Sequence, residues 1–153
     1  MVISIRRSRP DEGDKLIAIW CRSVDATHDF LTKAYRKELE EMVRAFLPEA
    51  SLWVAVNTED QPIAFMLLTG DHMDALFVDP DVRGCGVGKL LIEHALSLTP
   101  KLTTNVNEQN EQAVGFYQKM GFRVTGRSET DDLGQPYPLL NLMYEQQAEA
   151  DYD

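Results

Sequence analysis

Residues 72–98 read HMDALFVDPDVRGCGVGKLLIEHALSL, and this stretch decides the fold of the chain. It opens with an apolar run over residues 75–78, which predicts a β-strand. A proline-containing turn then leads to three glycines at alternate positions, Gly84, Gly86 and Gly88. Beyond the glycines, apolar side chains recur at helical spacing to the end of the stretch. The pattern predicts a strand, a glycine-rich turn and a helix.

The glycine-rich turn has the chemistry of an anion-binding site. The first turn of a helix presents about four unpaired backbone N–H groups and a partial positive charge. Glycines let a phosphate group approach those amides closely. Arg83 and Lys89 flank the glycines, and each can add a charge-assisted hydrogen bond to a phosphate oxygen. The alternative is a tight strand-to-helix turn that binds nothing.

The spacing of the glycines separates this loop from two known phosphate loops. The mononucleotide loop G-x-x-x-x-G-K-[ST] needs one more residue than the chain has between Gly84 and Gly88. Leu90 also stands where the magnesium-binding hydroxyl belongs. The dinucleotide fingerprint G-x-G-x-x-G follows an N-terminal first strand, whereas here G-x-G-x-G lies past the middle of the chain. Both of these classes of nucleotide site are poor matches.

The composition indicates one globular domain. A chain of 153 residues, 44% hydrophobic and 26% charged, fits a single domain, which we expect to extend over residues 1–144. No apolar run approaches about 18 residues, and the opening MVISIRRSRPDEG lacks an apolar core with a cleavage site. Cys21 and Cys85 make a poor disulfide framework. We therefore expect a cytoplasmic protein with reduced thiols.

The charge balance limits the classes of partner. The formal net charge is -10, from 25 acidic and 15 basic residues. This field opposes nonspecific binding to nucleic acid or to an anionic membrane and favours a cationic partner. His28, His72 and His94 lack metal-ligand spacing, and no C-x-x-C pair occurs, so no metal site is expected.

The rest of the chain alternates between short strands and helices. The pattern predicts strands at residues 2–6, 52–56, 63–69, 102–106, 122–127 and 139–144, and helices at about 10–23, 32–46 and 110–120. The order is β-α-α-β-β-β-α-β-α-β-β. Three successive strands without helices imply an antiparallel meander, and the glycine-rich turn opens a parallel crossover.

Three further local features follow from the pattern. Tyr35, Leu39, Met42 and Phe46 form an apolar stripe that we expect to be buried in the core. Gly121 follows the last predicted helix and is expected to cap it. Residues 145–153, EQQAEADYD, are acidic and have no large aliphatic side chain, so they are expected to form a disordered tail.

A second motif lies at residues 107–122, which read NEQNEQAVGFYQKMGF. This segment resembles the N-x-x-A-x-x-F/L-Y-x-K-x-G-F segment of the GCN5-related N-acetyltransferases, the GNAT family. The loop RGCGVG at residues 83–88 resembles the R/Q-x-x-G-x-G/A loop of the same family. With the element order, the resemblance extends over residues 2–144. It implies an α/β (α+β) GNAT fold, whose mixed, mostly antiparallel sheet has about seven strands with about four helices and is splayed between the fourth and fifth strands.

The resemblance also implies acetyl-coenzyme A as cosubstrate and assigns residues to it. In the family, the glycine loop binds the pyrophosphate, which here implicates Arg83, Gly84, Cys85, Gly86, Val87, Gly88 and Lys89. The amides of Phe77 and Val78 would polarise the thioester carbonyl or pair with the pantetheine arm, which lies between strands. Asn110 matches a position that often hydrogen-bonds pantetheine, and it can also serve as a helix N-cap.

Acetyl transfer to an amine needs a proton acceptor for the amine, a polarised carbonyl and a stabilised leaving thiolate. Tyr117 matches the tyrosine that commonly protonates the coenzyme sulfur, and the phenol pKa of about 10 is not far above the thiol value of about 8.5. Its alternative is an aromatic core residue. Asp74 is the first candidate for the general base and His72 the second, although each can instead be a structural hydrogen-bonding group.

The implied reaction moves acetyl from acetyl-CoA to a primary amine by direct attack in a ternary complex. Three stretches, DATHDFL, FLPEASLWVAV and DDLGQPYPLLNL, further resemble a bacterial member of the family regarded as a peptidyl-lysine N-acetyltransferase, which implies protein lysine as acceptor. His28 and Asp29, in the segment between the first two helices, are candidates for contact with substrate. A polyamine or aminoglycoside acceptor, and a noncatalytic acyl-CoA-binding sensor, are the alternatives. Both a monomer and a homodimer are open.

Overall fold

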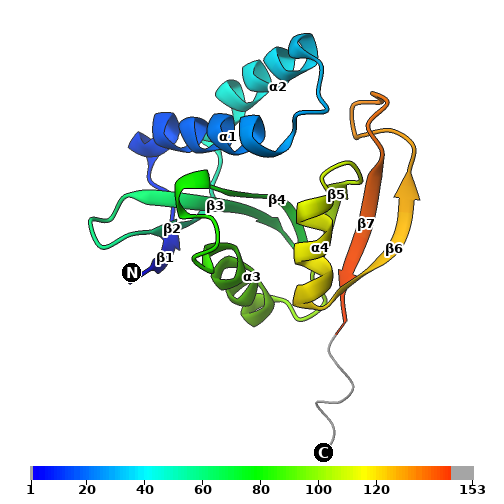
Figure 1. Cartoon of the computed structure of the whole chain (residues 1–153). Coiled ribbons are helices and arrows are strands. Elements are labelled where there is room, and N and C mark those ends of the chain that lie inside the picture. The colour runs from blue at the N-terminus through cyan, green and yellow to red at the C-terminus, as the bar shows by residue number, and fades with distance from the viewer. Residues whose placement is uncertain (1, 146–153) are drawn as a thin grey trace, which may run out of the picture. The chain divides into compact units, whose positions relative to one another are not determined.

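The fold was obtained as a computed structural model, which describes residues 2–145. The strands are β1 (Ser4–Arg7), β2 (Trp53–Val56), β3 (Pro62–Thr69), β4 (His72–Val78), β5 (Thr103–Asn107), β6 (Phe122–Ser128) and β7 (Leu139–Tyr144). The α-helices are α1 (Gly13–Thr27), α2 (Lys33–Phe46), α3 (Val87–Leu98) and α4 (Glu111–Met120), and the short 3-10 helices are η1 (Pro10–Glu12), η2 (Leu47–Glu49) and η3 (Pro80–Val82). Hydrogen bonds join the strands in the order β1-β2-β3-β4-β5-β7-β6 (Figure 1).

The chain divides into two compact units. The first contains the residues up to Leu68 together with Ala75–His94, and the second contains Thr69–Asp74 and the residues from Ala95 onward. Strand β4 and helix α3 therefore contribute residues to both units.

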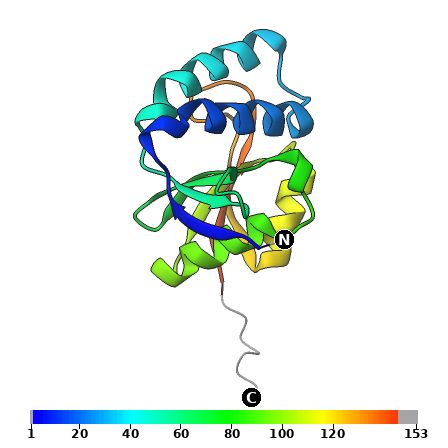
Figure 2. The same cartoon turned by 90° about the vertical axis from the view of Figure 1, so that its left-hand side faces the viewer.

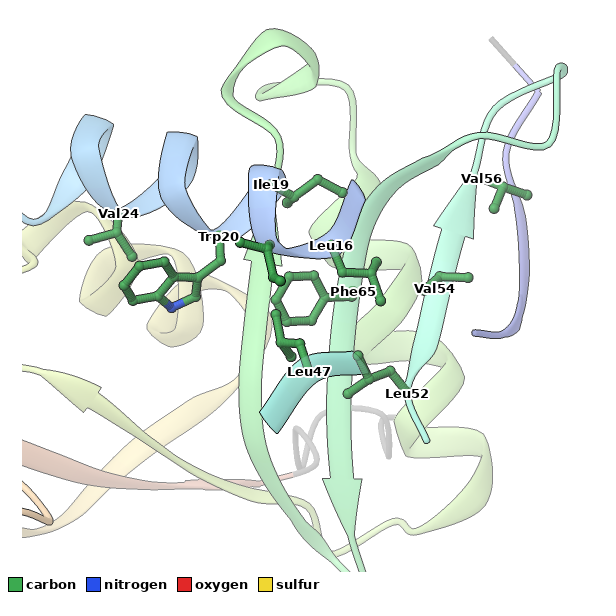
Figure 3. Packing of buried hydrophobic residues seen from close by; sticks show 10 residues of the cluster. Leu16, Ile19, Trp20, Val24, Leu47, Leu52, Val54, Val56 and Phe65 are labelled. Carbon is green, nitrogen blue, oxygen red and sulfur yellow. The ribbon is translucent and has the colours of Figure 1, made fainter. Parts of the chain in front are cut away.

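In the first unit, β1, β2 and β3 form an antiparallel ladder in which Val54 faces Phe65. Helix α1 lies over one face of these strands, and the start of α3 lies on the other side (Figure 1, Figure 2). Figure 3 shows the apolar side chains of α1 directed at Phe65 and at residues of β2 and η2. The buried cluster consists of Leu16, Ile17, Ile19, Trp20, Val24, Leu47, Leu52, Val54, Val56 and Phe65. Each fully buried side chain of this size contributes about 1.5–3 kcal/mol to folding.

The alternation of side chains along β2 supplies the opposite face. Trp53 points away from the α1 side, and its ring meets the His94 ring of α3 at a centroid distance of 4.3 Å. The Arg7 guanidinium of β1 lies 4.1 Å from the centroid of the Trp53 ring. A tryptophan at this position is therefore covered by a helix residue and by a cation–π contact.

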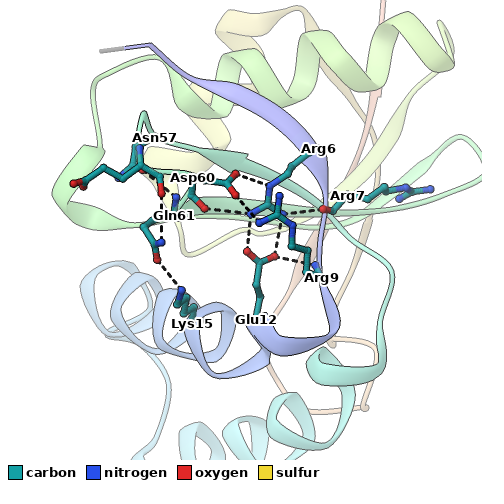
Figure 4. Close-up of polar contacts among 9 residues, drawn as sticks. Arg6, Arg7, Arg9, Glu12, Lys15, Asn57, Asp60 and Gln61 are labelled. Atoms are coloured by element: carbon teal, nitrogen blue, oxygen red, sulfur yellow. Dashed lines mark hydrogen bonds and ion pairs between the residues drawn. The ribbon is translucent and has the colours of Figure 1, made fainter.

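An ion-pair network joins β1 and η1 to the turn between β2 and β3 (Figure 4). Arg6 forms two parallel hydrogen bonds with Glu12, at 2.6 and 3.0 Å, and its Nε donates to Asp60 at 2.9 Å. Glu12 is only 4% exposed. The hydrogen bonds from Arg6 hold the pKa of Glu12 below its usual value, against the opposing effect of burial. Asp60 has a φ of 62°, so this turn includes a left-handed non-glycine residue.

In the second unit, β7 pairs antiparallel with β5 on one side and with β6 on the other. The first residues of β4 pair parallel with β5, with His72 opposite Thr103 and Met73 opposite Thr104. Helix α4 packs against β5 and β6. Gly121 ends this helix in the left-handed conformation, with a φ of 113°, which confirms the predicted cap.

The predicted fold class is confirmed: over residues 2–145, seven strands form a mixed sheet with four α-helices and a parallel β4–β5 pair. The splay between those strands and the single domain over residues 1–144 stay predictions. Two details of the prediction were wrong, namely the end of α1 and the burial of the apolar stripe of α2. Helix α1 continues to Thr27, because residues 24–27 include no glycine or proline to stop it. Of the predicted tail, residues 146–153 lie outside the described residues.

The apolar stripe of α2 is only partly buried. Tyr35 is buried and Leu39 packs against the core, as expected, but Met42 is 47% exposed and Phe46 is 50% exposed. Val43 takes the inward position instead. The helical period identifies the apolar side chains of α2, but the packing of α2 against α1 and η2 decides which of them the core covers.

Candidate functional site

The glycine-rich loop between η3 and α3 has the backbone that an anion site needs. Gly84 has a φ of 86° and Gly86 a φ of 81°, in the left-handed region that favours glycine. A Cβ atom at either position would meet nothing within 4 Å. The glycines are therefore required by the backbone conformation, and the space beside them is open. The side chains of Arg83 and Lys89 on either side are exposed.

Hydrogen bonds within the loop determine which amides are available. The Arg83 amide donates to Pro80 at 3.2 Å and the Cys85 amide donates to Val82 at 3.2 Å. The Leu90 amide donates to the Gly86 carbonyl at 3.1 Å, which is the first bond of α3. The amides before this bond, from residue 86 to residue 89, have no acceptor within the helix. They form a row of donors beside the left-handed glycines.

Asp79 anchors the start of this loop. Its amide donates to the Ile63 carbonyl at 2.9 Å, and its Oδ1 accepts from the Asp81 amide at 3.0 Å. Its Oδ2 accepts a hydrogen bond from the Arg22 guanidinium of α1. Burial raises the pKa of the Asp79 carboxyl, but the bonds from Arg22 and Asp81 outweigh burial and leave the pKa below its usual value. A charged, three-way anchor thus fixes the backbone that leads into the glycines.

Phe77 and Val78 end strand β4 just before this anchor, and both are half-buried. The Phe77 ring contacts Trp20 and Phe65, with centroid distances of 6.4 and 5.6 Å. The side chain of Phe77 therefore serves the core of the first unit, which leaves its backbone amide as the group with a possible role at a ligand. The predicted roles of both amides stay predictions.

In the second unit, the two candidate bases form one polar cluster. His72 and Asp74 lie two residues apart on the same face of β4, with Nε2 and Oδ1 3.6 Å apart. The His72 Nδ1 lies 2.7 Å from the Thr103 hydroxyl, and the Thr69 hydroxyl donates to the Asp74 Oδ2 at 2.5 Å. Their side chains are 33% and 39% exposed. The cluster is hydrogen-bonded and open to solvent, so proton exchange with water is possible at both candidates.

Tyr117 is buried on α4 at 7% exposure. Its ring makes edge-to-face contacts with Phe116 and Phe122, each at a centroid distance of 5.4 Å. Burial raises the pKa of the Tyr117 hydroxyl, and a hydrogen bond with the Thr104 side chain acts in the opposite direction. The residue thus has the aromatic surroundings of a core tyrosine. Its catalytic role stays a prediction.

Asn110 is the N-cap of α4, with its Oδ1 accepting from the Ala113 amide at 3.3 Å. The carbonyl side of this amide is used by the cap, while its NH₂ group carries two further donors. The predicted role of Asn110 as an N-cap is therefore confirmed. Its predicted hydrogen bond to pantetheine stays a prediction, for which the NH₂ group is the donor.

His28 and Asp29 lie at the junction of α1 and the segment before α2. The His28 amide donates to the Val24 carbonyl at 2.7 Å, and its Nδ1 lies 2.7 Å from the Thr27 hydroxyl. Asp29 is exposed. His28 therefore has a structural role as the C-cap of α1, and the contact of both residues with substrate stays a prediction.

Three residues near these groups were not identified from the sequence: Arg22, Asp79 and Thr104. A signal existed for Asp79, because Asp-Pro followed by an acidic residue is typical of a capped turn. Arg22 lies 57 positions before its partner, and Thr104 is one threonine in an ordinary strand pattern. No local signal distinguishes either of them.

Cys21 and Cys85 are free cysteines, half-buried and exposed respectively. Over residues 2–145, no group of three or more His, Cys, Asp or Glu side chains could hold a metal ion. Nor does any helix in this described part have the length and apolar character needed to cross a membrane.

Known proteins match most of this chain. A family profile described as "Acetyltransferase (GNAT) domain" matches residues 12–136. The chain is 78% identical over 144 residues to "Peptidyl-lysine N-acetyltransferase YjaB" of Escherichia coli (strain K12), covering 94% of this chain and 98% of that protein. It is 76% identical to the protein of the same name from Salmonella typhimurium, covering 94% of this chain and 99% of that protein.

The structures agree with this relationship. The solution structure of apo-form YjaB from Escherichia coli matches with a TM-score of 0.93 at 76% identity, covering 96% of this chain and all of that chain. The family profile covers most of the chain, and the curated relatives are matched over nearly their full length. The chain therefore belongs to the GNAT family of acetyltransferases.

Proposed function

We propose that this protein transfers an acetyl group from acetyl-CoA to the side-chain amine of a protein lysine. The observation that carries the proposal is the glycine-rich loop, with Gly84 and Gly86 in left-handed conformations directly before the free amides of α3. The names of the two bacterial relatives, which describe peptidyl-lysine acetylation, support the choice of acceptor. The reaction proceeds by direct attack of the amine in a ternary complex, and the enzyme acts in the cytoplasm as a monomer or homodimer.

The loop has the donors that a pyrophosphate group requires. Gly86, Val87, Gly88 and Lys89 supply the amides that have no helical acceptor, and the open space beside Gly84 admits phosphate oxygens. The exposed side chains of Arg83 and Lys89 add positive charge. Acetyl-CoA supplies the activated acetyl group as a thioester when it is bound.

Backbone and side-chain amides complete the proposed coenzyme contacts. The amides of Phe77 and Val78 donate to the thioester carbonyl or to the pantetheine arm, and donors aimed at such a carbonyl stabilise negative charge that develops on it. The NH₂ group of Asn110 donates to pantetheine while its Oδ1 remains on the helix cap.

The proton balance assigns roles to the titratable groups. An acceptor ammonium group releases two protons during the reaction. Asp74, assisted by the neighbouring His72, takes one of them and passes it to solvent. Tyr117 gives its phenolic proton to the leaving sulfur. The second proton that the acceptor nitrogen loses reaches Tyr117 through solvent and restores the phenol. The products are the acetylated amine, the free thiol and one proton in solution.

The acceptor is expected to be cationic because the protein carries a net charge of -10. His28 and Asp29 are proposed to contact it, with Asp29 supplying an exposed carboxylate. A polyamine or an aminoglycoside would satisfy the same electrostatic preference. A sensor that binds acyl-CoA without turnover would need the glycine-rich loop but not the proposed catalytic groups Tyr117, Asp74 and His72.

The proposal is tested by thiol release from acetyl-CoA with lysine peptides, polyamines and aminoglycosides, using the parent protein and Tyr117→Phe in parallel. We expect release that depends on the lysine peptide and falls in the variant, with coenzyme affinity changed by no more than a few fold. Release with a small amine alone would overturn the lysine assignment. Coenzyme binding without release for any acceptor would favour the sensor.

A further inference from the structure

Asp79 makes the two hydrogen bonds that join residues 79–85, here called the η3 turn, to other elements of the first unit. Its amide donates to the Ile63 carbonyl of β3 at 2.9 Å. Its carboxylate accepts from the Arg22 guanidinium of α1, a helix that packs against η3. Within the described residues 2–145, the other hydrogen bonds of the η3 turn stay inside it. Arg22 is therefore the side chain through which a helix holds this turn.

The two oxygens of the Asp79 carboxylate have different partners. Oδ1 accepts from the Asp81 amide at 3.0 Å and caps η3, while Oδ2 accepts from Arg22. Asp79 is 9% exposed, and burial of a carboxylate without a charged partner is costly. Without Arg22, the carboxylate would take up a proton or turn toward water, and either change weakens its bond to the Asp81 amide. The bond from Arg22 therefore keeps the cap of η3 in place.

Backbone hydrogen bonds connect Asp79 to the glycines of the loop. The Val82 amide donates to the Asp79 carbonyl at 3.0 Å, and the Cys85 amide donates to the Val82 carbonyl at 3.2 Å. Cys85 directly precedes Gly86, whose carbonyl accepts the first hydrogen bond of α3. A displacement of Asp79 would therefore also displace the amides at residues 86–89, which have no acceptor within the helix.

We propose that Arg22 is a positioning residue for coenzyme binding, which acts through the Asp79 carboxylate on the amides at residues 86–89. This inference rests on the proposed function, in which those amides bind the pyrophosphate of acetyl-CoA. That function assigns neither Arg22 nor Asp79 a contact with the reacting atoms. Loss of the Arg22 bond should therefore weaken coenzyme binding and leave the rate of acetyl transfer in the bound complex nearly unchanged.

The first test compares Arg22→Met, which removes the charge and the donors but keeps a long side chain, with Arg22→Lys, which keeps the charge. Calorimetric titration should show coenzyme A binding weakened by about 5- to 20-fold in Arg22→Met and by less than about threefold in Arg22→Lys. The loss is at the low end for a charged hydrogen bond because the Arg22 side chain is 50% exposed. If Arg22→Met does not fold, Arg22→Ala tests the same loss. Equal losses in the charged and uncharged variants, or no loss in either, would overturn the inference.

Arg44→Met is the matched control. Arg44 lies on α2, its side chain is 55% exposed, and it forms an ion pair with Glu40. The substitution changes the net charge as Arg22→Met does, but it removes no hydrogen bond of the η3 turn. Coenzyme A affinity should stay within about twofold of the parent value. A loss as large as that of Arg22→Met would indicate a general effect of charge and would contradict the inference.

A double-mutant cycle shows whether Arg22 acts through Asp79. Asp79→Asn removes the carboxylate charge and keeps an oxygen that can accept from the Asp81 amide. In that background, Arg22→Met should weaken coenzyme A binding by less than about twofold further. An undiminished loss would mean that Arg22 acts on the coenzyme without Asp79, and would refute the inference.

Steady-state kinetics with a lysine peptide separates failure of the inference from failure of the proposed function. In Arg22→Met, KM for acetyl-CoA should rise by about 5- to 20-fold, while kcat and the KM for the peptide stay within about twofold. A lower kcat with an unchanged KM for acetyl-CoA would mean that the inference alone fails. A parent protein that binds no coenzyme A would instead remove the proposed function, and the inference would fail with it.

Discussion

Replacing Gly86 by alanine tests the glycine-rich loop through backbone conformation alone. The φ of Gly86 is 81°, and an added Cβ meets nothing within 4 Å, so the substitution causes strain without a clash. Holding an L-residue in the left-handed region costs about 1–2 kcal/mol. The protein can keep the loop shape and lose that stability, or relax the loop and misplace the amides of α3.

The second response is expected to dominate, because residues 83–86 are exposed and, beyond the Asp79 anchor, the hydrogen bonds that the structure gives them belong to short turns. A free energy of about 1–2 kcal/mol corresponds to about a 5- to 30-fold loss of affinity for coenzyme A. Calorimetric titration of coenzyme A gives the affinity, and thermal unfolding of the same samples gives the stability. Gly86→Asn should lose less of both, since asparagine tolerates this region better.

Gly115→Ala is the matched control. Gly115 lies inside α4, has no positive φ, and its added Cβ also meets nothing within 4 Å. The same chemical change should therefore stabilise the protein by about 0.5–1 kcal/mol without changing coenzyme affinity. If Gly86→Ala binds coenzyme A as the parent does and also unfolds at the parent temperature, the reasoning about the loop is refuted.

Two further predictions concern charge. Arg83→Ala should weaken coenzyme A binding by about 10- to 100-fold, from loss of a charged hydrogen bond, and unchanged affinity by calorimetry would remove Arg83 from the site. Glu12→Ala should lower the free energy of unfolding by about 3 kcal/mol in urea titrations, at the low end for a broken buried pair because Asp60 still pairs with Arg6. The folded pKa of Glu12 is depressed, so this stabilisation is present above its unfolded pKa of about 4.3 and is lost as pH falls through the folded value. The gap between parent and variant should therefore close at acidic pH, and a gap that persists there would contradict the ion-pair origin.

The features that could be predicted from the sequence are those decided by residues close together along the chain. The glycine-rich turn, the Asn110 cap and the Gly121 cap each depend on residues within a few positions of one another. Strand boundaries were predicted within about two or three residues for the same reason, because apolar runs and turn residues alternate over short distances. These elements follow from backbone preferences that neighbours along the chain decide.

The parts that were missed depend on partners far apart in the sequence. The period of α2 could show which face is apolar but not that Met42 and Phe46 would remain half-exposed. The bond between Arg22 and Asp79 joins residues 57 positions apart. The bond from the Thr104 hydroxyl to the Met73 carbonyl appears only when β4 and β5 are paired. Such contacts depend on how distant segments pack, so no local sequence pattern predicts them.

Mass spectrometry of a lysine peptide, after incubation with acetyl-CoA and the parent protein, tests the central claim most directly. We predict that one acetyl group is added to the lysine side chain, that the addition requires the protein, and that Tyr117→Phe slows it while coenzyme A still binds. A peptide that stays unmodified, in a sample where calorimetry shows that coenzyme A is bound, would contradict the assignment of this chain as a lysine acetyltransferase.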